Sequence, residues 1–367
     1  MIINRDIIKS MKNLKELGYN DFFSEEKENI ESMGYSIARV IAEYKESYKV
    51  RDVKGEYLAK ITGKQAFNAK KREDYPAVGD WVAITKIDEE MATIHIVLPR
   101  KTMLTKKHSR RQDNQIIATN IDVAFIVESI DRDYNLNRFE RYLVLINEGN
   151  IKPAIILNKV DLISIEDLNQ KIKEIKERFN NIHVISTSTV SKQGIEELMD
   201  YIEKGKTYCF VGSSGVGKSS LINNLLGKSK IKTKEISNST GRGKHTTTNR
   251  EMYFLQNGGI VIDNPGTRGV GITSVKASIE NIFDQIALLS NDCKYDNCTH
   301  THESNCAVLS AVKRGEISKS RYLSYIKLRK ESEHYEMNDV QKRDKDRKFG
   351  KFIKKSMKEL KKNNEDR

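Results

Sequence analysis

Residues 207–220 read Thr-Tyr-Cys-Phe-Val-Gly-Ser-Ser-Gly-Val-Gly-Lys-Ser-Ser. An apolar, β-rich run breaks into glycines and is followed by a predicted helix that opens at Ser219. The glycines allow the backbone to fold into a concave nest whose amides point at phosphate oxygens. In such a loop Lys218 reaches the β- and γ-phosphates, and Ser219 offers its hydroxyl to Mg²⁺. The strand before and the helix after favour a phosphate-binding P-loop over a glycine-rich packing turn.

The sequence before the P-loop predicts a parallel sheet. Apolar runs at 121–130 and 153–157 indicate buried strands, and a helix is expected between them at 137–147. Alternating buried strands and helices are typical of a parallel sheet with helices on both faces, and binding loops lie at the carboxyl ends of its strands.

A base-reading motif, Asn158-Lys159-Val160-Asp161, follows the second of these strands. The Asp161 carboxylate can accept hydrogen bonds from N1–H and the exocyclic amine of guanine, whereas adenine would leave it unpaired. Lys159 would lie along the base, and Asn158 would tie this loop to the P-loop. Ser186-Thr187, after a third predicted strand, stands where G proteins contact the guanine O6.

Two further motifs follow the P-loop helix. Gly-Arg-Gly-Lys-His-Thr-Thr-Thr at 241–248 has the character of a switch I loop, in which Thr247 or Thr248 would bind Mg²⁺ and sense the γ-phosphate. On its own this stretch also fits a polar hairpin loop. Asp263-Asn264-Pro265-Gly266 is a D-x-x-G motif, in which Asp263 holds Mg²⁺ through water and the Gly266 amide meets the γ-phosphate.

The sequence therefore predicts GTP or GDP and Mg²⁺ as cofactors. The predicted nucleotide-binding residues are Asn158, Lys159, Val160, Asp161, Ser186, Thr187, Gly212, Ser213, Ser214, Gly215, Val216, Gly217, Lys218, Ser219, Ser220, Asp263 and Gly266. The predicted Mg²⁺ ligands are Ser219, Thr247, Thr248 and Asp263.

These motifs stand in a permuted order along the chain, with the guanine-reading loops before the P-loop. Together with a predicted N-terminal barrel and a cysteine cluster, the permutation resembles the RsgA (YjeQ/YloQ) family of ribosome-small-subunit-dependent GTPases over roughly residues 35–325. The resemblance implies a GTP hydrolase that binds 16S rRNA of the maturing 30S subunit near the decoding region and leaves on hydrolysis. Three of the four cysteines crowd into residues 293–306, so a disulfide framework is unlikely and a cytoplasmic protein is expected. We also expect a monomer, with other 30S assembly factors as further candidate partners.

Catalysis must differ in detail from that of Ras-like proteins. Thr267 stands where they place the glutamine that orients the attacking water. A backbone group, His245 or ribosomal RNA would have to position the water instead, and a slow intrinsic rate is expected. Lys218, Thr247 and Thr248 are the other predicted catalytic residues, since they contact the reacting phosphate or its metal.

A metal site is predicted from Cys293, Cys298, His300 and Cys306. Three thiolates and one imidazole fill a tetrahedral zinc shell and leave no open position, so the zinc would be structural. His302 competes with His300 as the fourth ligand, and the spacing in the RsgA family favours His300. Cys209, in the P-loop strand, is expected to be a core thiol.

Short alternating segments between residues 36 and 107 predict five strands, and an OB-fold is the commonest small barrel that binds nucleic acid. Lys70, Lys71 and Arg72 fall in a loop of this barrel, where phosphate contact is expected. Four aromatic residues could stack on bases or fill the barrel core, with the core favoured for Trp81; they are Tyr48, Tyr57, Phe67 and Trp81.

The formal net charge is +13, and residues 311–367 alone contribute +9. Basic arms around an enzyme core suit an anionic polymer, and the chain shows no apolar run of membrane-spanning length. The expected multidomain α/β organisation is a helical extension at 1–35, an OB-fold at 36–107, a circularly permuted GTPase domain at 108–285 with a polar linker at 108–120, a helical zinc-binding domain at 286–330 and a basic tail at 331–367.

Two functions remain open at this point. One is a partner-stimulated GTPase, and the other is a non-enzymatic RNA-binding assembly scaffold with nucleotide as a structural ligand. Lys218, Ser219, Asp263 and a switch I threonine favour the enzyme, because a scaffold would not need them. Asp161 disfavours a protein driven by ATP.

Overall fold

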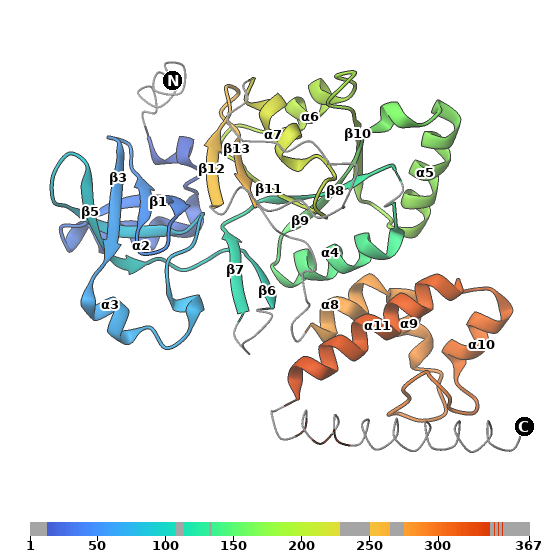
Figure 1. The fold of residues 1–367 in the computed structure, drawn as a ribbon. Helices are drawn as coiled ribbons and strands as arrows, with labels where there is room; N and C mark the ends of the chain where they lie inside the picture. The colour runs from blue at the N-terminus through green and yellow to red at the C-terminus, as the bar shows by residue number, and fades with distance from the viewer. Residues whose placement is uncertain are drawn as a thin grey trace, which may run out of the picture. The chain divides into compact units, whose positions relative to one another are not determined.

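The chain divides into two units, Met1–Gly271 and Ile272–Arg367 (Figure 1). The computed structural model describes residues 13–107, 114–131, 134–227, 250–264 and 275–337, with Gln341, Asp344 and Arg347. The division at 271 differs from the predicted domain boundary at 285, because helices α8 (Lys276–Ile282) and α9 (Asp284–Ser290) belong to the second unit. Within the described ranges, none of the helices combines the length and apolarity that a bilayer span requires.

A closed five-stranded barrel forms the first part of the larger unit. Its strands pair in the order β1-β2-β3-β5-β4, and β4 pairs back onto β1, which is the OB-fold arrangement. Val40, Val50, Ile84 and Ile94 are buried inside it, and they come from β1, β2, β4 and β5. The bounds are β1 (Ser36–Glu43), β2 (Tyr48–Arg51), β3 (Glu56–Ile61), α3 (Gly63–Asn68), η3 (Arg72–Asp74), β4 (Trp81–Lys86) and β5 (Met91–Val97).

The barrel aromatics divide between core and surface. Trp81 is fully buried, as predicted, and Tyr57 is also buried under the ammonium of Lys86, so Tyr57 is not available for base stacking. Phe67 is 89% exposed in α3.

The second part is a mostly parallel sheet with strand order β10-β9-β8-β11-β13-β12, in which β12 alone pairs antiparallel. Helices α6 and α7 cover one face, and α4 and α5 cover the other (Figure 1). The bounds are β8 (Val123–Ser129), α4 (Leu136–Glu148), β9 (Lys152–Asn158), η4 (Val160–Leu162), α5 (Ile165–Arg178), β10 (His183–Thr187), α6 (Ile195–Tyr201), β11 (Thr207–Val211), α7 (Lys218–Leu225), β12 (Arg250–Phe254) and β13 (Ile260–Asp263).

A two-stranded ribbon of β6 (Met103–Lys107) and β7 (Asn114–Thr119) connects the barrel to this sheet. The prediction of a polar linker at 108–120 was therefore wrong for its second half, because Ile117 and Ala118 bury their side chains. Residues 108–113 lie outside the described ranges.

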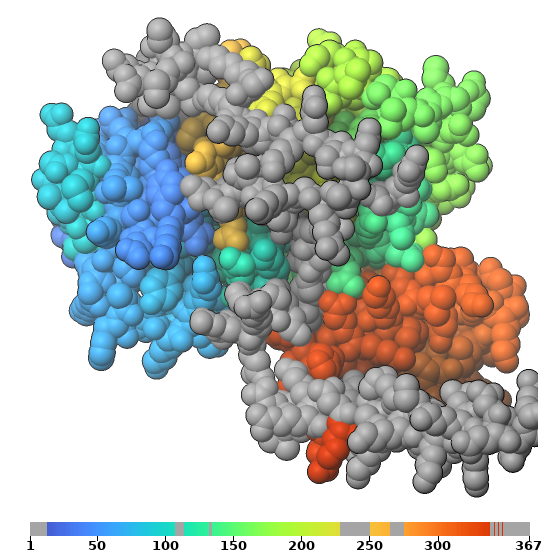
Figure 2. Space-filling model, in the orientation of Figure 1, coloured from blue at the N-terminus to red at the C-terminus, as the bar shows by residue number. Residues whose placement is uncertain are grey.

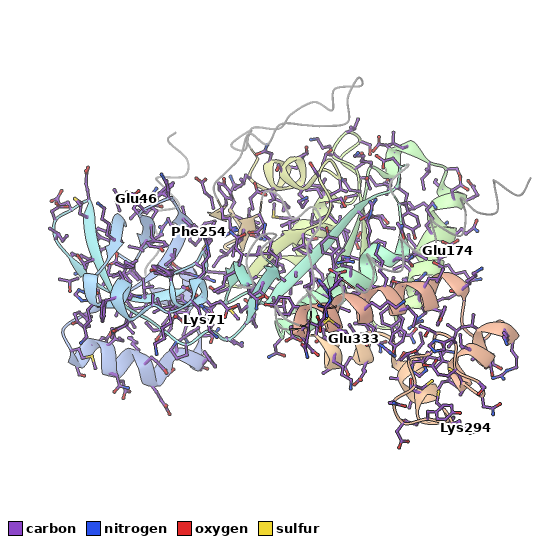
Figure 3. The ribbon with its side chains drawn as sticks, turned by 60° about the horizontal axis from the view of Figure 1, so that its bottom comes forward. Glu46, Lys71, Glu174, Phe254, Lys294 and Glu333 are labelled. Atoms are coloured by element: carbon purple, nitrogen blue, oxygen red, sulfur yellow. The ribbon has the colours of Figure 1, made fainter. Side chains whose placement is uncertain are left out.

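The barrel and the sheet are joined by backbone hydrogen bonding as well as by the ribbon. Strand β1 pairs antiparallel with β12, so the structure forms one 11-stranded sheet across both parts. The gold surface of β12 and β13 lies directly beside the blue barrel (Figure 2). Phe254 of β12 lies at this boundary (Figure 3), where the guanidinium of Arg51 sits 4.9 Å from its ring centroid.

Arg39 joins three parts of this unit. Its buried guanidinium donates hydrogen bonds to three carbonyl oxygens, those of Leu17 at 2.5 Å, Asn120 at 3.1 Å and Gly79 at 3.3 Å. Burial lowers the pKa of Arg39 to about 10. The N-terminal helix η1 (Leu14–Leu17) is thereby fixed to the barrel and to the end of β7, and η2 (Asp21–Phe23) and α2 (Ser24–Ser32) follow it.

The second unit is helical. It contains α8 (Lys276–Ile282), α9 (Asp284–Ser290), α10 (Ala307–Arg314) and α11 (Lys319–Glu336). Phe283, Ile286 and Val308 are buried between these helices, and the loop between α9 and α10 carries the cysteine cluster. Helix α11 extends past the predicted domain end at 330.

We predict that Arg39→Met lowers the free energy of unfolding of the first unit by about 2–4 kcal/mol, because three buried carbonyl groups lose their donor. Urea unfolding followed by tryptophan fluorescence measures this, since Trp81 lies 5.4 Å from the Arg39 guanidinium. Lys60→Met, at an exposed position of β3, is the control and should leave the midpoint unchanged. Equal midpoints for the two variants would contradict this account of Arg39.

Candidate functional site

The P-loop connects β11 to α7 at the carboxyl edge of the sheet. Gly217 has φ of 98°, in the left-handed region, and a Cβ there would lie 2.2 Å from Nδ2 of Asn158. Gly212 approaches the carbonyl of Val127 just as closely, because a Cβ would lie 2.2 Å from that oxygen. Glycine at both positions therefore lets the loop pack this closely against its neighbours.

The other predicted P-loop residues take distinct places. Val216 is buried, Ser214 and Gly215 are exposed, and Ser219 and Ser220 lie in the first turn of α7. The side chain of Ser213 is hydrogen-bonded to the phenol of Tyr142, on α4. The tip of the loop therefore faces solvent while both of its ends are anchored.

Lys218 lies at the bottom of the P-loop and is 9% exposed. Its ammonium donates to the carbonyl oxygens of Gly212 and Ser213 at 2.8 and 2.7 Å. Burial lowers the pKa of Lys218 to about 8, an effect that the carboxylates of Asp263 and Glu128 oppose. The structure thus places the ammonium of Lys218 near Asp263, the predicted Mg²⁺ ligand.

Asp263 ends β13 and is 3% exposed. Burial raises the pKa of its carboxyl group to about 6, and the nearby Lys218 acts in the opposite direction. The next residue, Asn264, donates from its side-chain amide to the sulfur of Cys209 at 2.8 Å, which fixes the start of the D-x-x-G loop to β11. Cys209 is a fully buried thiol, as predicted for the core.

The guanine-reading loop begins where β9 ends. The side-chain amide of Asn158 donates to the carbonyl oxygen of Val216 at 2.8 Å, so the loop is tied to the P-loop as the sequence suggested. Lys159 has φ of 64°, and its ammonium pairs with Asp131 at 2.9 Å. Val160 is buried beneath the loop, while Asp161 lies in the short helix η4.

Ser188 was not among the residues that the sequence analysis assigned to the nucleotide site. Ser186 and Thr187, predicted to form the turn that contacts the base, are instead the last two residues of β10, and the turn starts at Ser188. The Ser188 hydroxyl donates to the carboxylate of Asp161, and Thr187 donates to the side-chain oxygen of Asn158 at 3.1 Å. The available signal was the spacing in sequence between Ser188 and Gly194, the N-cap of α6, but its use required the end of β10 to be known.

Several predicted residues lie outside the described ranges. They are His245, Thr247, Thr248 and Gly266, together with Thr267 and the basic stretch at 351–362.

The second unit brings Cys293, Cys298, His300 and Cys306 together, with all four ligand atoms within 4.8 Å of one another. Zinc bonds of about 2.3 Å to sulfur and 2.0 Å to nitrogen in a tetrahedron require S···S and S···N separations of about 3.8 and 3.5 Å. The sulfurs of Cys293 and Cys306 are 3.8 Å apart, and Nδ1 of His300 lies 3.6 and 3.4 Å from them. The four residues therefore fit a tetrahedral metal ion.

His300 rather than His302 belongs to this cluster. His300 is 4% exposed, and its Nε2 lies 3.2 Å from the hydroxyl of Ser290, which orients the ring. His302 is exposed, and its Nδ1 contacts the hydroxyl of Thr301. Glu303 accepts the backbone amides of Thr299, Thr301 and His302 and holds the loop in shape.

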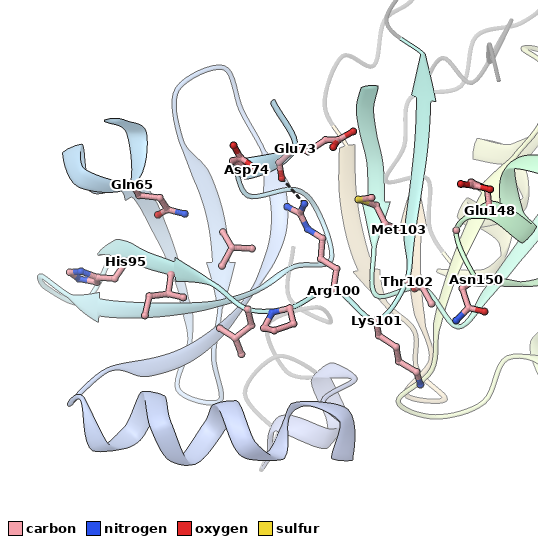
Figure 4. Close-up of a pocket in the computed structure, with 15 residues that line it drawn as sticks. Gln65, Glu73, Asp74, His95, Arg100, Lys101, Thr102, Met103, Glu148 and Asn150 are labelled. Carbon is pink, nitrogen blue, oxygen red and sulfur yellow. Dashed lines mark hydrogen bonds between the residues drawn. The ribbon is translucent and has the colours of Figure 1, made fainter. Parts of the chain in front are cut away.

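The predicted RNA-contacting loop lies at one end of the barrel. The backbone amides of Lys70 and Lys71 donate to Asp74 at 2.8 and 2.9 Å, and both lysine side chains are exposed. Arg100 fixes the loop from below, because it pairs with Asp80 and donates to the carbonyl oxygens of Glu73 and Tyr75 (Figure 4). The loop is thus a fixed basic surface beside a pocket at the barrel–ribbon boundary.

The strand order and the permuted motifs define a circularly permuted GTPase with an OB-fold barrel and a Cys₃His cluster. The model of the RsgA GTPase family matches residues 97–273. The chain is 40% identical to the small ribosomal subunit biogenesis GTPase RsgA 2 of Lactiplantibacillus plantarum, over 84% of this chain and 86% of that protein. It is 38% identical to RsgA 1 of Bacteroides thetaiotaomicron, over 93% of this chain and 96% of the relative.

A solved structure agrees with this. YjeQ from Thermotoga maritima is 28% identical and covers 80% of this chain and 97% of its own, with a TM-score of 0.58. The chain therefore belongs to the RsgA GTPase family, and it is a GTP hydrolase.

We predict that Ser188→Ala weakens GDP binding about five- to tenfold, because the carboxylate of Asp161 loses a hydrogen-bond donor that fixes its orientation. Isothermal titration calorimetry measures the dissociation constant. Ser191→Ala removes an exposed hydroxyl of the same turn that does not contact Asp161, so GDP affinity should be retained. An unchanged affinity in Ser188→Ala would remove Ser188 from the site.

Proposed function

We propose that this chain binds the small ribosomal subunit during its biogenesis and hydrolyses GTP there, in contact with 16S rRNA near the decoding region, and that hydrolysis releases it. The observation that supports the proposal most strongly is the meeting of Lys218, Asp263 and the Asn158–Asp161 loop at one edge of the sheet. The names of the relatives support the partner, since they are small ribosomal subunit biogenesis GTPases.

The proposed reaction needs few groups from the protein. The amides of the P-loop and Lys218 would bind the β- and γ-phosphates, and Ser219 and Asp263 would hold Mg²⁺, directly and through water. When bound, Mg²⁺ neutralises charge that develops between the β- and γ-phosphates. Asp161 would select guanine. The two switch I threonines, His245 and Gly266 keep their predicted roles in this proposal, with His245 as one candidate for positioning the water.

RNA contact is proposed for Lys70, Lys71 and Arg72. Their charges are exposed on a loop that Asp74 and Arg100 hold in place, so phosphate binding would not require the loop to order first. We expect weaker binding at higher salt concentration, because each phosphate contact releases counterions.

We predict that purified 30S subunits stimulate GTP turnover and leave ATP turnover unchanged. Lys218→Ala should abolish stimulated hydrolysis, since the phosphates lose their cation, and Asp161→Ala should lower guanine nucleotide affinity by about a hundredfold. Phosphate release with and without 30S subunits measures both. Tight GTP binding without turnover under either condition would contradict the GTPase and favour an assembly scaffold.

A structural zinc ion is proposed at Cys293, Cys298, His300 and Cys306. We predict one zinc ion per chain by atomic emission, and loss of that zinc in Cys306→Ser. Without it the loop between α9 and α10 should open to limited proteolysis, because the ligands link the two helices. Cys209→Ser is the control, since that buried thiol lies outside the cluster, and it should retain zinc. A zinc-free wild-type protein of unchanged protease resistance would contradict a structural metal.

A further inference from the structure

The carboxylate of Glu43 pairs with two arginines, Arg72 in the loop 70–72 of the barrel and Arg250 in the sheet. Glu43 is the last residue of β1 and stands opposite Arg250, the first residue of β12, in the antiparallel register. One carboxylate oxygen accepts a hydrogen bond from Arg250 at 3.0 Å. The other lies 3.9 Å from the guanidinium of Arg72, in the loop proposed to contact RNA.

Arg250 connects this carboxylate to the catalytic edge of the sheet. It follows the stretch 241–248, which the sequence assigns to switch I, and its guanidinium also donates to the carbonyl oxygen of Ile116. The next residue, Glu251, stands opposite Asp263 in the pairing of β12 with β13. In β12, Arg250 therefore pairs with Glu43 of the barrel, and the next residue, Glu251, pairs with Asp263, the proposed Mg²⁺ ligand.

The two arginines differ in their access to solvent. The Arg72 side chain is 52% exposed, whereas that of Arg250 is 14% exposed. A phosphate from outside can therefore reach Arg72 but not Arg250. Lys106 is a third cation near this cluster. Its pKa is lowered mainly by burial and in addition by the positive charge of Arg250. An RNA phosphate at Arg72 would add negative charge beside these three cations.

We propose that Glu43 is a positioning residue that couples RNA binding at Arg72 to the register of β12 and, through β12, to Asp263. When an RNA phosphate pairs with Arg72, the carboxylate of Glu43 pairs with Arg250 alone and holds β12 more firmly against the barrel. Because such coupling is reciprocal, a nucleotide state that favours this register also strengthens RNA binding. This inference rests on the proposed function.

The test compares 30S affinity in two nucleotide states. Fluorescence titration of the full-length protein gives the 30S dissociation constant with GDP and with a non-hydrolysable GTP analogue. In Glu43→Gln we expect the ratio of the two constants to shrink about five- to tenfold toward one. We also expect Glu43→Gln to have no further effect on the ratio in an Arg72→Gln background, because the coupled pair is already broken.

Glu56→Gln is the matched control. Glu56 is 22% exposed and Glu43 is 23% exposed, and Glu56 is likewise shared between two cations, Lys49 and Arg51. Arg51 also packs on β12, but at Phe254, the end of the strand away from Arg250. The Glu56→Gln ratio should equal that of the wild type.

A wild-type ratio in Glu43→Gln would overturn the coupling, and so would an equal loss in Glu43→Gln and Glu56→Gln, which would indicate general loosening of the barrel. Wild-type protein that binds 30S subunits equally in both nucleotide states would overturn the coupling while leaving GTP hydrolysis intact. Wild-type protein that does not bind 30S subunits at all would overturn the proposed function itself.

Discussion

The parallel pairing of β8, β9, β10, β11 and β13 is the constraint on which the site depends. Parallel strands place their carboxyl ends at one edge of the sheet, whatever the order in which the chain visits them. The guanine-reading loop therefore meets the P-loop although it comes first in the sequence. The contact of Asn158 with Val216 shows how closely the two loops pack, and glycine at position 217 is what leaves room for it.

The barrel and the nucleotide-binding sheet are joined by one continuous sheet, unlike two domains that only a flexible linker connects. A backbone pairing of β1 with β12 makes the barrel an extension of the nucleotide-binding sheet. Strand β12 lies between the barrel and β13, so its two neighbours are β1 of the barrel and the strand that ends at Asp263. A shift of β12 would change hydrogen bonds on both of its sides at once.

Much of the fold and most of the site could be predicted because they depend on local patterns. Apolar runs gave the strands, and fixed spacings gave the P-loop, the Asn158–Asp161 motif and the cysteine cluster. What could not be predicted depends on contacts distant in sequence. The hydrogen bond of Ser188 with Asp161 spans 27 residues, and β7 was hidden in a polar stretch because its few apolar residues are buried only after pairing with β6.

Charge burial at the barrel boundary argues for a fixed orientation of barrel and sheet. Arg39 and Asp80 are fully buried there, and their partners come from the N-terminal helices, the barrel and β7. Rotating the barrel would separate these groups from their partners and leave charges unpaired in a dry interior, at a cost of about 3–5 kcal/mol for each broken pair. Communication between the barrel and the nucleotide site is then expected to run through small changes in strand pairing and side-chain contacts rather than through a hinge.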